Sequence, residues 1–199
     1  RPSQSEESLQ GNGRLGQDLR TITNFDAIAL HANMDVEMNS AFEQVVVEAE
    51  DNIFDNIVTN VDKGMLHIHW KEGQWVNKTL PIKIKLPLKT LSAVHLNDLG
   101  FITIRDTIVG DSLKLQNNGG GDLSLLLKVD HLQAKIHGSG NIKMAGMANH
   151  LDGSIHGSGD LDAFDLAVQT VNLHTEGGGR SELQVLKSIK GATHGGGNV

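Results

Sequence analysis

The sequence predicts an all-β protein folded as a right-handed parallel β-solenoid. Three observations support this prediction. A short glycine phrase returns along the C-terminal half of the chain, its copies are about 20 residues apart, and apolar residues alternate with polar ones on both sides of each copy. A fixed period of this size is typical of stacked supersecondary units, each of which buries its apolar face against its neighbours.

The glycine phrase has the form Gly-x-Gly. Its third position falls at Gly121, Gly140, Gly159, Gly179 and Gly197, so that the spacings are 19, 19, 20 and 18 residues. We expect a tight corner at each copy, where the third glycine takes positive φ or where a Cβ would strike the neighbouring rung. The expected structural turn residues are Gly119, Gly121, Gly138, Gly140, Gly157, Gly159, Gly177, Gly179, Gly195 and Gly197.

The residues around each phrase alternate in polarity. Counted from the third glycine, positions −8, −6, −4, +2 and +4 are mostly apolar and the positions between them are mostly polar. Around Gly140 the apolar set is Leu132, Ala134, Ile136, Ile142 and Met144. A period of two is that of a strand with one buried face. Each copy is therefore expected to contribute two short strands joined by the glycine turn, in rungs of about 19–20 residues.

The domain organisation follows from where this pattern begins. Residues 1–20 open with the Pro-, Ser-, Gln- and Glu-containing composition of a flexible tether. The remainder, 21–199, is expected to form one domain, with an irregular part over 21–90 and the regular repeats over 91–199. The solenoid pattern already starts at Phe25, with Met34 standing where the third glycine would lie.

Two elements interrupt the pattern in the irregular part. Apolar residues on one helical stripe predict a short helix over 51–61, with Asp51 or Asn52 as its N-cap. Strand-like runs at 65–70 and 75–86 predict a β-hairpin across the turn between them.

Composition excludes several classes of protein. The formal net charge is −7 and Lys and Arg form no cluster, which argues against a nucleic-acid-binding or anionic-membrane surface. The chain has no cysteine, so disulfides, thiolate metal sites and cysteine catalysis are excluded. No apolar run is long enough to span a bilayer. Because Arg1 is an unusual first residue, we expect an export signal to have been removed.

Several short stretches also carry a resemblance to a known family. They are Phe-Asp-Ala-Ile at 25–28, Asp-Val at 35–36, Gly-Met-Leu-His-Ile at 64–68, and the Gly-Ser-Gly-Asn and Gly-Ser-Gly-Asp turns. In this combination the chain resembles the putative auto-transporter adhesin head domain, or GIN domain, of Bacteroidetes-type envelope proteins, from about residue 11 to its end. The resemblance implies a β-helix from a family without an established enzymatic activity, and export to the periplasm, the outer-membrane surface or the outside of the cell. Similar sequences continue past the last glycine turn with a short closing segment, whereas this one stops at Val199.

Two polar rows beside the glycine turns are candidate metal sites. Position −3 holds Asn118, His137, His156, Glu176 and His194, and position +1 holds Asp122, Asn141, Asp160, Arg180 and Asn198. Stacked rungs lie roughly 4.8 Å apart, so His156, Glu176 and His194 could together hold a divalent metal. A solvent-facing polar row is the preferred interpretation of position −3. At position +1 we prefer hydrogen bonds to the turn backbone, with Arg180 neutralising Asp160, over calcium. No metal or other cofactor is therefore predicted.

Aromatic and histidine side chains mark a second candidate region. Trp70 and Trp75 flank a short turn and could stack on sugars, with packing across the predicted hairpin as the alternative. His67 and His69 share one face of a strand, a spacing that can bind metal. Because the sequence fixes no third ligand, we interpret them as exposed strand residues.

The function predicted from these features is a non-enzymatic, exported envelope module that binds a surface glycan or protein. No catalytic residues are predicted, because no nucleophile elbow, phosphate loop or His-Glu-x-x-His segment occurs and position −5 holds no carboxylate pair. One alternative is a carbohydrate-active β-helix enzyme that acts on a polysaccharide. The other is a self-assembling envelope scaffold, a homo-oligomer joined through exposed rung edges.

Overall fold

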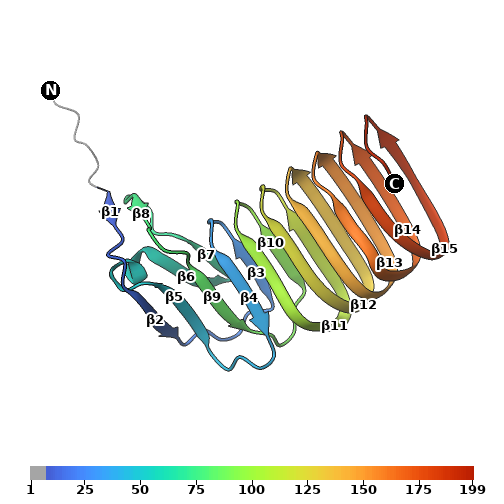
Figure 1. Cartoon of the computed structure of the whole chain (residues 1–199). Helices are drawn as coiled ribbons and strands as arrows, with labels where there is room; N and C mark the ends of the chain where they lie inside the picture. Colours follow the sequence, from blue (N-terminus) through green and yellow to red (C-terminus); the bar gives the residue numbers. More distant parts are fainter. Residues whose placement is uncertain (1–7) are drawn as a thin grey trace.

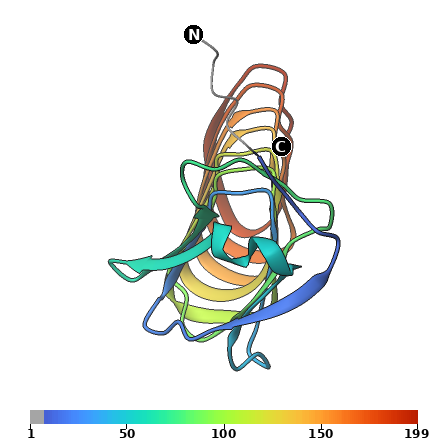
Figure 2. The same cartoon turned by 90° about the vertical axis from the view of Figure 1, so that its left-hand side faces the viewer.

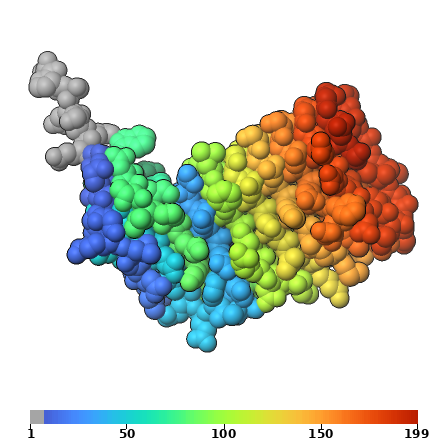
Figure 3. Space-filling model, in the orientation of Figure 1, coloured from blue at the N-terminus to red at the C-terminus, as the bar shows by residue number. Residues whose placement is uncertain are grey.

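Each glycine phrase lies where one coil of a parallel β-solenoid ends and the next begins (Figure 1). The computed structural model describes residues 8–199; residues 1–7, the first part of the expected tether, lie outside the described residues. The coils stack into an elongated molecule, with the N-terminal elements at one end and the last rung at the other (Figure 3). The predicted all-β solenoid is confirmed.

Five long strands form the C-terminal half, and each makes most of one coil. A strand leaves a glycine turn, follows one face, passes through a bend and returns along the other face. Neighbours pair in parallel, with Asp122 beside Asn141 and Leu132 beside Leu151. The two short strands expected around each turn are therefore the ends of two long ones. These are β11 (Phe101–Asn117), β12 (Asp122–Gly138), β13 (Asn141–Gly157), β14 (Leu161–Glu176) and β15 (Ser181–His194).

Shorter strands continue the two faces toward the N-terminus. The face that we call the histidine face comprises β6 (Ile57–Asp62), β7 (Met65–Trp70), β3 (Ala27–Leu30), β10 (Ala93–Leu96) and the later parts of β11–β15. The opposite face comprises β2 (Leu15–Arg20), β5 (Val45–Glu50), β9 (Lys83–Pro87), β4 (Asp35–Asn39) and the earlier parts of β11–β15. Two short strands, β1 (Leu9–Gln10) and β8 (Val76–Asn77), pair separately.

One apolar core runs along the inside of the coil, as the alternation predicted. The inward residues of the Gly140 copy are all buried, and so are those of the copies on either side. Asn117 is the one polar side chain at these positions, and its exposure is 0%. Its amide nitrogen donates to the carbonyl oxygens of Gly121 (2.8 Å) and Asn141 (3.1 Å), so its burial is compensated by hydrogen bonds.

The bend absorbs the differences in rung length. The rung with a spacing of 20 has one extra residue in β14, between the pairs Lys143–Asp162 and Ala145–Asp165. Phe164 lies in this bulge and is 62% exposed. Because extra residues are expelled at the bend, the turn edge and both flat faces keep their register along the solenoid.

The glycine turns correct one expectation. Positive φ belongs to the first glycine of the phrase, with +120° at Gly138 and +122° at Gly157, and not to the third. The third glycine is required by close packing: a Cβ on Gly197 would lie 2.5 Å from the Gly179 oxygen, and a Cβ on Gly159 would overlap the Gly140 oxygen. The second reason foreseen from the sequence therefore applies at that position.

The irregular part contains one short helix and one hairpin, as predicted, but their residues differ from those expected. The helix expected over 51–61 is a 3-10 helix, η1 (Asp51–Asn56), whose N-cap is Glu50 without a side-chain cap, and the chain then continues as β6. The expected hairpin partner of β7 is also different. β7 pairs antiparallel with β6 through Lys63 and Gly64, which have φ of 50° and 79°. Such a pair of positive φ values is typical of a two-residue hairpin turn.

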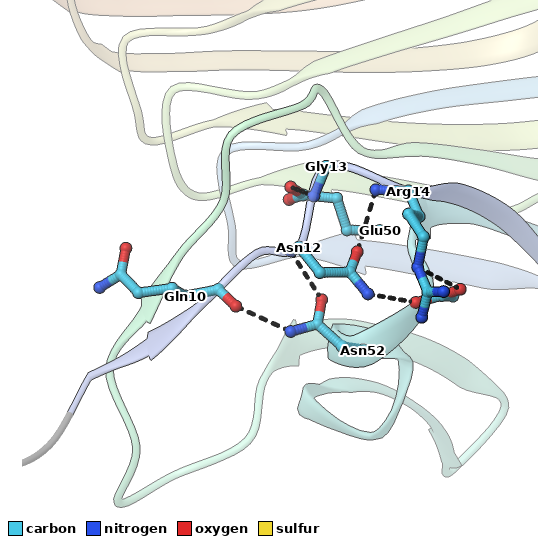
Figure 4. Close-up of polar contacts among 7 residues, drawn as sticks. Gln10, Asn12, Gly13, Arg14, Glu50 and Asn52 are labelled. Carbon is cyan, nitrogen blue, oxygen red and sulfur yellow. Dashed lines mark hydrogen bonds and ion pairs between the residues drawn. The ribbon is translucent and has the colours of Figure 1, made fainter.

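The N-terminal segment covers the first rungs. In Figure 2 η1 lies across the N-terminal end of the coil. Asn52 joins the chain before β2 to η1, since its amide accepts from the Asn12 N–H (3.1 Å) and donates to the Gln10 oxygen (2.7 Å) (Figure 4). β2 pairs antiparallel with β5 over its whole length. The flexible tether predicted for residues 1–20 is therefore wrong from Leu9 onward, because backbone pairing orders a segment with little apolar character.

Glu50 is the buried acidic group of this cap. Its exposure is 0%, and its carboxylate accepts hydrogen bonds from the N–H of Gly13 (2.9 Å), the N–H of Thr79 (3.0 Å) and the Thr79 hydroxyl. Burial alone would raise the pKa of Glu50, but these donors together with the Leu80 N–H outweigh it and lower the pKa below its ordinary value. The carboxylate thus joins three segments that are distant in sequence.

Candidate binding surface

All ten histidines of the chain lie on the histidine face. They project outward from, or directly beside, its strands, and none is buried: His31, His67, His69, His95, His131, His137, His150, His156, His174 and His194. Outward positions of consecutive parallel strands fall into rows, since residues two apart share a face and neighbouring strands are in register. The rows at −3 and −5 bring many imidazoles close together.

One group surrounds Ala29, where β7, β3 and β10 run side by side. His67 and His95 are in register with Ala29 on its two sides, and His31 lies two residues beyond it. The rings of His31 and His67 stack with 5.4 Å between centroids, and His31 Nε2 lies 3.1 Å from His67 Nδ1. The small side chain of Ala29 leaves room for these rings.

A directed chain of hydrogen bonds fixes the protons in this pair. The Asn118 amide nitrogen donates to Asn97 Oδ1 (2.8 Å), so the Asn97 amide nitrogen faces His31 Nδ1 (3.1 Å). His31 Nδ1 is then an acceptor, and its Nε2–H donates to His67 Nδ1. In this arrangement the Nδ1 of His31 and the Nδ1 of His67 each face a donor, so a proton on either Nδ1 would break the chain.

The electrostatics agree with this arrangement. The pKa of His31 is lowered, first by partial burial and then by His67, His69 and His95. Burial, followed by His67 and Lys114, likewise lowers the pKa of His95. Like charges at these distances repel, so protonation of one imidazole opposes protonation of the next.

Two hollows meet beside this group. One, of about 540 Å³, is lined by His31, Asn60, Asp62, His67, His69, Trp70 and Glu72. The other, of about 410 Å³, is lined by Trp70, Gly73, Gln74, Trp75 and Val76. Trp70 belongs to both, and His69 is fixed against it, since His69 Nδ1 lies 2.9 Å from the Trp70 carbonyl oxygen.

The two tryptophans predicted as a ligand surface therefore lie in one hollow. Trp70 is half-buried and packs against the core, while Trp75 is 69% exposed. Their relation is not cross-hairpin packing, because β7 pairs with β6 and Trp75 belongs to the loop that leads to β8. The ring of Trp70, fixed against the core, and the exposed ring of Trp75 are suited to binding a flat ligand between them.

The −3 row continues along the C-terminal rungs in the predicted order. His137 and His156 stack with 4.9 Å between ring centroids, and His156 Nδ1 lies 3.0 Å from Glu176 Oε2. This hydrogen bond, then the charge of His156, lowers the pKa of Glu176. His194, the third member of the candidate metal set, packs edge-on to His174 instead. Within residues 8–199 no three His, Cys, Asp or Glu side chains are placed to hold one metal ion.

The side chains at position +1 make different hydrogen bonds from those expected. Asn141 donates to Asp122 Oδ1 (2.9 Å), and the side chains of Asn141 and Asp160 accept from the backbone N–H of Asp160 (3.0 Å) and Arg180 (2.9 Å). These bonds join neighbouring rungs rather than closing each residue's own turn. Asp160 thus meets the backbone of Arg180, and none of the ion pairs found within residues 8–199 joins their side chains.

The pattern that assembles the histidine face was present in the sequence but was missed. Eight histidines lie 3, 5 or 9 residues before a third-glycine position, counting Met34 and Gly100 among these positions. Odd offsets point outward, so all eight had to share one face. His67 and His69 follow no glycine phrase, and their place beside β3 required the structure.

These observations define a class: a single parallel β-solenoid with one flat face of histidine rows and aromatic hollows at its N-terminal end. The chain belongs to the family described as "Putative auto-transporter adhesin, head GIN domain", whose family model matches residues 24–199. The resemblance inferred from the sequence is confirmed. A search of curated proteins gives no match.

Solved structures share the fold over nearly the whole chain. A putative adhesin from Bacteroides fragilis has 18% identity and a TM-score of 0.78, covering 96% of this chain and 100% of that one. A putative adhesin from Parabacteroides merdae has 20% identity and a TM-score of 0.73, with 96% and 99% covered. A putative lipid-binding protein from Parabacteroides distasonis has 19% identity and a TM-score of 0.70, with 97% and 100% covered. Within residues 8–199 no helix has the length and apolar character needed to cross a membrane.

Proposed function

We propose that this chain is a non-enzymatic binding module of an exported cell-envelope protein, and that it holds a glycan between Trp70 and Trp75. The observation that carries the proposal is the shared hollow of about 410 Å³, with one wall fixed on the core and the other free. Sugar rings present flat C–H faces that pack on aromatic rings, and Gln74 adds a polar group beside them. The descriptions of structural relatives as putative adhesins support a binding role.

The row that would have to carry hydrolysis argues against the enzyme alternative. Position −5 on the histidine face reads His67, Ala29, His95, Gln116, Lys135, Ser154, His174 and Ala192 in spatial order. Glycoside hydrolysis requires two carboxyl groups that flank the scissile bond. This row offers none, and the carboxylates of Asp152 and Glu176 on the same face lie in other rows, each against a histidine.

A glycan array with the whole chain tests the proposal. Trp75→Ala is expected to weaken binding of the selected glycan roughly 30-fold, since loss of an aromatic anchor costs about 2 kcal/mol. Phe164→Ala is the matched control, because Phe164 is an equally exposed aromatic residue, 62% against 69%, in the bulge of β14. Calorimetry on both variants measures the difference.

Three results would contradict the proposal. Release of a cleaved product, abolished by His156→Ala or Glu176→Ala, would show an enzyme. An equal loss of glycan affinity in Trp75→Ala and in Phe164→Ala would show that the hollow between the tryptophans is not the binding site. Binding to lipid vesicles that Phe164→Ala abolishes and Trp75→Ala leaves unchanged would move the ligand site to the bend.

A further inference from the structure

The hollow beside the tryptophans contains a group of ionisable side chains that the proposed function does not use. His31, His67 and His69 line it together with Trp70, and His95 completes the group around Ala29. No other part of residues 8–199 combines four histidines with an adjoining aromatic hollow. Histidine is the residue type whose ordinary pKa, about 6.5, lies closest to neutral pH, so a group of histidines is suited to a charge that depends on pH.

At neutral pH this hollow repels anions. The hydrogen-bond chain from Asn97 uses the Nδ1 of His31 and the Nδ1 of His67 as acceptors. The charged groups that face the histidines from the neighbouring elements are Asp62 at the end of β6, Glu72 after β7 and Lys114 on β11. The hollow itself thus carries the carboxylates of Asp62 and Glu72, and the imidazoles of His31 and His67 present no proton on Nδ1.

In acid the charge that this hollow presents to a ligand becomes positive. A proton on His31 turns its Nδ1 into a donor that faces the Asn97 amide, and a second proton on His67 places two cations in a stack of 5.4 Å. Both changes force the rings apart and free their N–H groups. His69 needs no such change, since its two ring nitrogens face the oxygens of Trp70 (2.9 Å) and Asn60 (3.1 Å). The freed N–H groups of His31 and His67 then face the hollow as donors to an acidic group.

We infer that this group binds the acidic groups of a carboxylated or sulfated glycan at acid pH and releases them at neutral pH, beside the sugar held by the tryptophans. The inference rests on the proposed function, because Trp70 is shared by the two hollows. The rest of the face supports a polymer of this kind: six more histidines continue along the rungs. The spacing of about 4.8 Å between strands is close to the length of one sugar residue in an extended chain.

A polysaccharide is favoured over a lipid surface by the position of the apolar side chains. Five of the exposed large ones gather at the bend, at Val109, Leu126, Met147, Phe164 and Leu186, whereas the strands of the histidine face carry two, Val61 on β6 and Ile189 on β15. Insertion into a bilayer requires apolar contact beside the basic groups. The histidine face offers imidazoles and amides in rows, which are suited to charges spaced along a hydrated chain.

The experiment compares matched probes at two pH values. The whole chain is titrated with tetragalacturonate and its methyl ester, and with a sulfated dextran fragment and its unsulfated form, at pH 7.5 and 5.0. The glycan acids stay ionised at both values. We expect at least one acidic probe to bind about tenfold or more tightly at pH 5.0 than at 7.5. The neutral partners should bind equally at the two values.

Variants locate the effect. His31→Gln/His67→Gln should abolish the pH dependence and leave binding of the neutral probe unchanged. His174→Gln/His194→Gln, a matched pair from the far end of the same face, should keep the pH dependence for these short probes. Melting temperatures of both variants equal to that of the wild type at pH 7.5 establish that they are folded.

The outcomes separate the inference from the proposed function. Neutral probes that bind through Trp75 while neither acidic probe depends on pH would overturn the inference alone. Acidic probes that gain affinity in acid equally in both histidine variants would also overturn it. Acid-dependent binding to vesicles of phosphatidylglycerol and phosphatidylcholine, without binding of any glycan, would overturn the ligand class and the proposed function together.

Discussion

Glu50 shows how a single residue holds the irregular end of the solenoid. Its carboxylate is fully buried, yet every donor around it comes from a segment that the sequence places far away, at residues 13 and 79–80. No local pattern predicts such a contact, because the residue lies at the end of a strand and reads as an ordinary exposed Glu. The structure was needed to find it.

Replacement of this carboxylate should destabilise the fold. Glu50→Gln places an amide NH₂ against the N–H groups of Gly13 and Thr79, so we expect a loss of about 2–3 kcal/mol in the free energy of unfolding. Glu48→Gln is the matched control, since Glu48 lies on the same strand and is partly exposed in an ion pair with Lys85. Chemical denaturation measures both, and a Glu50→Gln loss no larger than the control would contradict the assignment.

The pH dependence of stability follows from the lowered pKa of Glu50. The unfolded state binds a proton first as pH falls, so the stabilisation is complete above the ordinary pKa of Glu and is lost as pH drops through the folded-state pKa. Wild type should therefore lose stability on acidification more steeply than Glu50→Gln. Parallel slopes for the two proteins below pH 5 would be inconsistent with this account.

At the scale of elements, the glycine phrase is the feature that sequence alone explains best. Its period, the inward residues and the stacking of successive phrases are all as predicted, because each rung repeats the same local constraints. The physical reasons for the glycines differ between positions: the first glycine is required by its positive φ and the third by the lack of space for a Cβ. Spacing alone cannot distinguish these two causes.

Substitution within one phrase should separate crowded from open positions. In Gly159→Val the new Cβ overlaps the Gly140 oxygen, so we expect a loss of about 3 kcal/mol or more. Ser158→Ala, the neighbouring exposed position, should cost less than about 0.5 kcal/mol. Since rungs are stabilised by their neighbours, hydrogen exchange should show lost protection around Ile142 and Leu183 as well as Leu161. Equal melting temperatures for the two variants would disprove the packing argument.

The N-terminal elements are not predicted correctly by hydrophobic periodicity alone. Ile53 and Ile57 are both buried and four residues apart, which suits a helix, yet only the first lies in η1 and the second opens β6. The hairpin turns at Lys63 and Gly64 and not at residues 71–74, and the sequence Asp62-Lys63-Gly64 is the more typical of a two-residue hairpin turn. Non-repeated segments lack the averaging over copies that made the C-terminal rungs clear.

On the scale of the whole molecule, the histidines are concentrated on one face. The opposite face and the bend carry no histidine, and the formal net charge is −7 with all histidines neutral; ten added protons would bring it to +3, with every new charge on one face. The sequence predicted the tryptophans as a ligand surface, and the structure brings them into one hollow beside four histidines. That neighbourhood depends on β7 pairing with β3, which are separated by more than 30 residues.

The central claim is that ligands bind at the N-terminal end of the histidine face. NMR of labelled tryptophan indoles and histidine imidazoles tests it directly, because both Trp residues and all ten His lie on or beside this face. Titration with the glycan selected by the array should shift the signals of Trp70, Trp75 and His69 most and leave those of His150 and His194 in place. Saturable binding that moves only the distant histidines, or none of these signals, would contradict the account.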